Sequence, residues 1–161
     1  MKKFIPFILL LVIAASCTKE VPESEKKIAK TTSEKEIKDL IEKFVTSFNS
    51  GEFEKLPLYF TSDYGGYIPD SDSALSSTEY QNELQKFHAR YPDGKLLVNI
   101  ENVYVSEDLA AVQTFSSFMT YDPIEGKLSP ASSERSIKLL RKTKNEGWKI
   151  FKSLSIPAFS Y

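Results

Sequence analysis

The sequence predicts an α+β domain in which helices come first and an antiparallel sheet follows. Two capping boxes, each followed by apolar residues at helical spacing, lie in the first half of the 161-residue chain. From Leu96 onward the pattern changes to segments dense in β-branched and aromatic residues, separated by turn signals. Helices followed by a run of strands favour an α+β arrangement with the helices packed on one face of the sheet.

The first predicted helix begins at a capping box, with Ser33 three residues before Glu36. Its apolar residues follow the i, i+3, i+4, i+7 series of one helical face, and they are Ile37, Leu40, Ile41, Phe44, Val45 and Phe48. The triplet Asn49-Ser50-Gly51 is typical of a helix end. Segment 52–59 predicts a short second helix that Pro57 bends or ends, because proline has no amide hydrogen to donate.

Segment 61–77 is rich in Ser, Asp, Gly, Tyr and Pro, so it is predicted to be mostly loop with a short strand near 66–68. A second capping box, Ser76 with Glu79, opens a third helix. The residues of this helix at helical spacing are Tyr80, Leu84, Phe87, His88 and Tyr91. The triplet Pro-Asp-Gly at 92–94 ends it.

Four strands are predicted after the third helix, at 96–105, 109–121, 134–144 and 148–156. The apolar residues change parity near Asn102, which indicates a β-bulge in the first of these strands. Turns at 106–108 and 145–147 and a loop at 122–132 connect them. In the strand 134–144, Ile137 and Leu139 alternate with Ser136 and Lys138, so its two faces differ in polarity.

Composition excludes several classes of function. The chain has 21 Lys plus Arg against 22 Asp plus Glu, which leaves no basic excess for a nucleic-acid backbone. One cysteine excludes an intrachain disulfide framework and a cysteine-cluster zinc site. One histidine excludes two-histidine metal motifs. The sequence Asp70-Ser71-Asp72 begins like a calcium loop but lacks the later ligands, so neither a metal nor another cofactor is predicted.

The first residues have the three-part pattern of a secretory signal, with Met1-Lys2-Lys3, an apolar run over 4–15 and small residues before Cys17. The apolar run is shorter than the roughly 20 residues that a membrane-spanning helix needs. The sequence Ala14-Ala15-Ser16-Cys17 resembles the lipobox of bacterial lipoproteins. This resemblance implies cleavage before Cys17 and fatty acylation of its thiol and new amine.

The predicted organisation is therefore a lipoprotein signal peptide at 1–16, a flexible tether at 17–32 and one domain at 33–161. The tether has few apolar residues with which to offset the entropy of ordering it. The resemblance places the protein in a bacterial cell envelope, anchored to the membrane through Cys17. This is the outer membrane where the organism has one, because Thr18 replaces the Asp associated with inner-membrane retention, and otherwise the outer face of the plasma membrane.

The order of elements from 34 to 157 resembles the NTF2-like family, which includes the SnoaL-like proteins. The resemblance depends on the long helix running into 48–56, on the hairpin 103–112 and on Gly147-Trp148-Lys149-Ile150. It implies three N-terminal helices packed on a curved antiparallel sheet that forms a cone. It also implies a mainly apolar pocket, which in catalytic members holds an Asp or His base beside hydroxyl donors, and it leaves room for a homodimer through the outer face of the sheet.

An aromatic group is the predicted lining of this pocket, because aromatic rings supply apolar area and a few hydroxyl donors. Its members are Tyr59, Tyr64, Tyr67, Phe118 and Tyr121. His88 is the only imidazole that could act as a base, although a histidine at the edge of an apolar helix face more often packs or faces solvent. Arg135 and Lys152, on neighbouring strands, could meet an anionic ligand or remain solvated.

Two classes of function are consistent with these patterns. The first is a non-enzymatic, membrane-tethered domain that binds a small apolar ligand or an envelope protein. The second is an enzyme of the isomerase, dehydratase or hydrolase kind that uses His88 and a pocket tyrosine. The segment 151–155 of the last strand contains no histidine or carboxylate, whereas many family members carry pocket histidines there, so the first class is favoured.

Overall fold

The computed structural model describes residues 22–158 except 70, 123 and 125. Cys17, the predicted signal peptide and the first part of the predicted tether lie outside the described residues. None of the helices in the described part is both long and apolar enough to cross a membrane.

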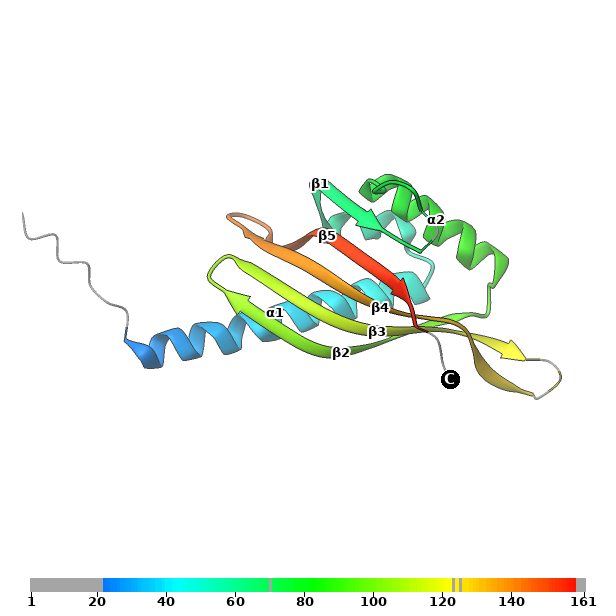
Figure 1. Cartoon of the computed structure of the whole chain (residues 1–161), viewed down its shortest axis with the longest axis horizontal. Coiled ribbons are helices and arrows are strands. Elements are labelled where there is room, and N and C mark those ends of the chain that lie inside the picture. Colours follow the sequence, from blue (N-terminus) through cyan, green and yellow to red (C-terminus); the bar gives the residue numbers. More distant parts are fainter. Residues whose placement is uncertain (1–21, 70, 123, 125, 159–161) are drawn as a thin grey trace, which may run out of the picture.

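The first helix, α1, spans Glu23–Asn49 and so begins well before the predicted capping box at Ser33. The prediction of a flexible tether up to residue 32 is wrong from residue 23 onward. The segment 23–32 is rich in Glu and Lys, which favour helix. Glu23 and Glu25 lie in the first turn, where a negative charge interacts favourably with the helix dipole. Figure 1 shows this exposed part of α1 projecting beyond the sheet.

The predicted second helix is a 3₁₀ helix, η1, over Phe53–Tyr59, and Pro57 lies inside it. A strand, β1, follows directly at Phe60–Tyr67, where the sequence pattern predicts mostly loop. The next helix, α2, spans Ser77–Arg90 and begins at the predicted capping box. A strand therefore separates η1 from α2, and the expectation that three helices precede the whole sheet is not met.

The remaining strands are β2 at Lys95–Ser106, β3 at Leu109–Asp122, β4 at Lys127–Thr143 and β5 at Gly147–Pro157. The register of β2 on β3 shifts between Ile100 and Asn102, which confirms the predicted bulge. The prediction of a loop is wrong for segment 127–132, which pairs with β3, as in Leu128 with Tyr121. Gly126, with φ of 65°, adopts the left-handed conformation in the turn that connects β3 to β4.

The five-stranded sheet has the order β1-β5-β4-β3-β2. Strands β2 to β5 form the predicted antiparallel meander, whereas β1 pairs in parallel with β5, so the sheet is mixed. Helix α1 packs along β2, and α2 packs against η1 and β1 (Figure 1). The buried core between α1 and the sheet includes Ile37, Ile41, Phe44, Val112, Leu140 and Ile150.

Candidate functional site

A cavity of about 500 Å³ lies between the two α-helices and the inner face of the sheet. This volume is within the range of about 300–1,000 Å³ that small-molecule sites occupy. The lining residues are Ile41, Phe44, Phe48, Ile68, Pro69, Tyr80, Glu83, Leu84, Phe87, Leu96, Val98, Ser116, Phe118, Ser132, Ser133, Glu134, Lys138 and Pro157. Most of them come from α1, α2, β2, β3 and β4.

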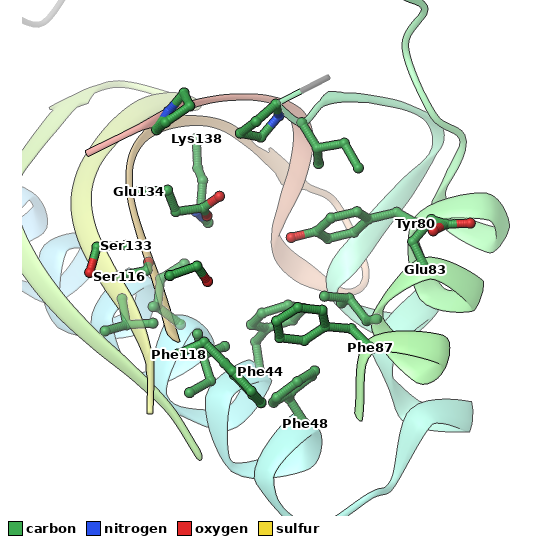
Figure 2. A pocket seen from close by; sticks show the side chains of 18 residues that line it. Phe44, Phe48, Tyr80, Glu83, Phe87, Ser116, Phe118, Ser133, Glu134 and Lys138 are labelled. Carbon is green, nitrogen blue, oxygen red and sulfur yellow. The ribbon is translucent and has the colours of Figure 1, made fainter. Parts of the chain in front are cut away.

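One side of the cavity is aromatic. Phe44 and Phe48 reach it from α1, Phe87 from α2 and Phe118 from β3, and Figure 2 shows these rings gathered together. The Phe118 ring centroid lies 4.4 Å from that of Phe87 and 6.1 Å from that of Phe48, both in edge-to-face geometry. This side offers apolar surface and no charged group.

The phase of α2 decides which of its residues reach the cavity. Tyr80, Leu84 and Phe87 are spaced by four and three residues, so they share one helical face. His88 lies about 100° further round the helix. Its ring packs edge-on against Phe53 and Phe48, with centroids 5.2 and 5.8 Å away, and it is not among the lining residues.

The opposite side of the cavity is polar and comes mainly from β4. Glu134, Ser136 and Lys138 alternate along the strand and so face the helices together. Lys138 Nζ donates to Ser136 Oγ and, at 3.4 Å, to Thr114 Oγ1. Ser155 Oγ on β5 donates to Glu134 Oε1 at 3.3 Å. Figure 2 shows Glu134 and Lys138 beside each other on this side, away from the phenylalanines.

Burial shifts the titration of the polar groups. It raises the pKa of Glu134, and the charge of Lys138 and the hydrogen bond from Ser155 offset this only in part. Burial lowers the pKa of Lys138, again against the attraction of Glu134. The pKa of the Tyr80 hydroxyl is raised well above its usual value, chiefly by burial. Three titratable groups whose pKa values are shifted by burial thus line the same cavity.

Of the predicted pocket residues, Phe118 lines the cavity and the four tyrosines do not. Tyr59 shares a hydrogen bond of 2.9 Å with Ser47 Oγ of α1. Tyr64 is buried in the core and shares a hydrogen bond of 2.6 Å with Ser153 Oγ. Tyr67 and Tyr121 are 40% and 57% exposed. The aromatic lining comes instead mainly from α1 and α2.

Arg135 and Lys152 do not meet at a site. Arg135 lies on the outer face of the sheet, with its guanidinium 5.5 Å from the Phe115 ring centroid and 3.5 Å from Glu101. Lys152 is exposed on β5. Within residues 22–158, leaving aside 70, 123 and 125, no three His, Cys, Asp or Glu residues gather closely enough to hold a metal ion.

The sequence pattern does not single out Tyr80, Glu134 and Lys138 as site residues. Helical spacing places Tyr80 on the apolar face of α2, which is correct, but it gives no role to the hydroxyl. Glu134 and Lys138 share the strand parity of Ser136, which is 2% exposed, while Ile137 between them is 50% exposed. The available signal is a strand whose polar face is rich in serine. This face lines the cavity because it is turned toward the helices, and the sequence pattern does not give that direction.

No family model and no curated protein matches the sequence. Solved structures do match. An NTF2-like protein with a cystatin-like fold from Novosphingobium aromaticivorans aligns with a TM-score of 0.76 at 14% identity, covering 89% of this chain and 94% of that one. An NTF2-like protein from Streptomyces avermitilis, named provisionally as a dehydratase, aligns with a TM-score of 0.66 at 17% identity, covering 81% of this chain and 99% of that one. An NTF2-like superfamily protein from Salmonella enterica aligns with a TM-score of 0.64 at 14% identity, covering 81% of this chain and 94% of that one.

The chain has an α+β fold in which helices cover one face of a mixed sheet. The structural matches show that this is the NTF2-like, or cystatin-like, fold. At these identities the likeness concerns the fold alone.

Proposed function

We propose that the chain is a membrane-anchored bacterial lipoprotein whose NTF2-like domain binds a small, mainly apolar ligand in the cavity, without catalysis. The observation that carries the proposal is the cavity itself, which joins an aromatic side from α1, α2 and β3 to a small set of polar groups. Ligand sites in proteins commonly combine apolar walls with a few polar groups that fix orientation.

Native mass spectrometry of the purified chain tests ligand binding. We expect a discrete added mass on the wild-type chain, and its loss in Leu84→Trp, where the larger ring occupies part of the cavity. Tyr121→Ala is the matched control, because Tyr121 is exposed and does not line the cavity. It lies on the β3–β4 ribbon, the paired ends of β3 and β4 near their connecting turn, where Tyr121 pairs with Leu128. A mass that persists unchanged in Leu84→Trp would place the bound molecule elsewhere.

The anchor belongs to the same proposal and depends on Cys17. Two or three acyl chains on that residue would supply the multiple signals that stable membrane attachment requires. Growth with an alkyne-bearing fatty acid, followed by labelling, should tag the wild-type chain and leave Cys17→Ser untagged. A tag that remains in Cys17→Ser would argue against a lipobox.

The catalytic alternative uses His88 as its base, but the His88 ring lies against Phe48 and Phe53 and is not part of the cavity lining. Within the cavity, Glu134 is the better candidate for a general base, because burial raises the pKa of its carboxyl group. Conversion of a bound compound that stops in Glu134→Gln would support an enzyme. Binding with no conversion supports the proposal above.

The outer face of the sheet carries exposed apolar side chains that an envelope partner or a second copy of the chain could contact. Ile137 and Leu154 lie opposite each other on β4 and β5 and are 50% and 51% exposed. Ile156, 56% exposed, lies in the next row beside Arg135. Exposed apolar side chains in neighbouring rows favour association, and we propose a homodimer through this face.

A further inference from the structure

The two sides of the cavity differ in a way that restricts what it can hold. The aromatic side carries Phe44, Phe48, Phe87 and Phe118, and the polar side carries Glu134 and Lys138 (Figure 2). A ligand with an apolar body and one polar end would match both sides. If the cavity binds a ligand as proposed, Glu134 and Lys138 determine which chemical group that polar end can carry.

Hydrogen bonds within the protein leave capacity at the polar side. The Lys138 ammonium has three donors, and the structure uses it toward Ser136 Oγ and Thr114 Oγ1. Glu134 receives a hydrogen bond from Ser155 at Oε1, and a carboxylate can accept several. Tyr80 presents its hydroxyl to the cavity from α2 (Figure 2). The polar side can therefore both donate to a ligand and accept from it.

The charges that line the cavity balance. Glu134 and Lys138 have opposite signs, and Glu83, the third charged lining residue, is paired with Lys86 at 2.8 Å. An anionic ligand would place its charge beside the Glu134 carboxylate, and a cationic one beside the Lys138 ammonium. Burial of an ion without a partner of opposite charge is costly. The cavity therefore disfavours both kinds of ion.

We infer that the cavity selects an uncharged, mainly apolar molecule carrying one group that both donates and accepts hydrogen bonds, such as an alcohol, a phenol or an amide. The polar group lies among Glu134, Lys138 and Tyr80, donating to the carboxylate and accepting from the ammonium. The apolar body lies among the four phenylalanines. The polar contacts that select the ligand come from Glu134 and Lys138 of β4 and from Tyr80 of α2, and the apolar contact area comes from α1, α2 and β3.

Three probes of the same shape test this inference on the full chain held in lipid nanodiscs. Naphthalene is apolar, 2-naphthol adds one neutral donor and acceptor, and 2-naphthoate is an anion. Occupancy is measured from the methyl NMR signals of Leu84 and Leu96, which line the cavity. Dialysis sets the free probe concentration in the aqueous phase, so partition into lipid does not enter the dissociation constant.

We expect 2-naphthol to bind about tenfold more tightly than naphthalene, because hydrogen bonds to charged groups are among the stronger ones. We expect 2-naphthoate to bind more weakly than 2-naphthol. Lys138→Met and Glu134→Gln should each reduce the preference for 2-naphthol over naphthalene about tenfold. Lys152→Met is the matched control, since Lys152 is exposed on the adjacent strand and lies outside the lining.

The outcomes separate the two proposals. Equal affinities for naphthalene and 2-naphthol would overturn the inference while leaving an apolar binding function in place. Tightest binding of 2-naphthoate would overturn it in favour of an anion site. No shift at the Leu84 and Leu96 methyls with any probe would contradict both the inference and the proposed function. The comparison of probes on the wild-type chain holds even if a variant fails to fold.

Discussion

Glu134 and Lys138 lie four residues apart on β4, and each affects the titration of the other. Burial raises the pKa of Glu134 above 4.5, its ordinary value, despite the nearby ammonium. A carboxyl whose pKa is higher in the folded chain than in the unfolded chain contributes stability below the unfolded pKa. That contribution is lost as pH rises through the folded pKa.

Glu134→Gln removes this dependence and provides a test. The free energy of unfolding of the wild-type chain minus that of Glu134→Gln should fall as pH rises from about 4 to 7. Urea unfolding at several pH values measures this difference. A difference that instead grows with pH would mean that the paired Lys138 outweighs burial, and that the pKa of Glu134 is lowered in the folded chain.

Gly94 lets Phe118 reach the cavity. A Cβ atom at Gly94 would lie 2.1 Å from Phe118 Cζ and 2.9 Å from the backbone oxygen of Tyr91. Gly94→Ala should therefore displace the Phe118 ring and lower the free energy of unfolding by about 1–3 kcal/mol, as overpacking does. Chemical denaturation measures the loss. Gly65→Ala is the control, because its Cβ would meet Ala74 at an ordinary 3.6 Å.

At the scale of elements, α2 depends on its capping box. Ser76 Oγ accepts from the Glu79 amide at 3.3 Å, and Glu79 Oε2 accepts from the Ser76 amide at 2.8 Å. Ser76→Ala should cost about 1 kcal/mol of stability, because the Glu79 amide loses its partner. The same change in Ser77, which makes no side-chain hydrogen bond with another described residue, should cost less than about 0.5 kcal/mol. Thermal unfolding of the two variants gives the comparison.

The elements that depend on local chemistry are the ones that the sequence predicts well. The capping box of α2 and the bulge of β2 are set by residues within a few positions of each other, so the sequence pattern is sufficient. Strand β1 escapes prediction because its pairing partner β5 lies far along the chain, and its Gly-Gly pair is typical of a turn. The early start of α1 escapes prediction because its first turns are exposed and carry no apolar face.

The whole molecule presents an outer sheet face on which Ile137, Leu154 and Ile156 are half exposed. If two copies pair through this face, Ile137→Asp places two like charges in the interface and should convert dimer to monomer. Analytical ultracentrifugation over a range of concentrations measures this change. The same substitution at Tyr121, on the projecting β3–β4 ribbon, should leave the association unchanged. A wild-type chain that is monomeric throughout the range would contradict the proposed homodimer.

The sequence by itself determined the α+β class, the helical faces of α1 and α2 and the alternation within β4. These depend on spacing of 3.6 or 2 residues and on turn chemistry, which are local properties. It also supplied the resemblance behind the proposed lipid anchor at Cys17.

Only the tertiary structure decided which face of β4 turns toward the helices. That face carries Ser136, buried, with Glu134 and Lys138 beside it, while Ile137 faces outward. Alternation separates the two faces of a strand but does not say which one is covered, because that depends on how the neighbouring strands and helices pack. The polar side of the cavity, and the parallel pairing of β1 with β5, depend on contacts between residues far apart in the chain.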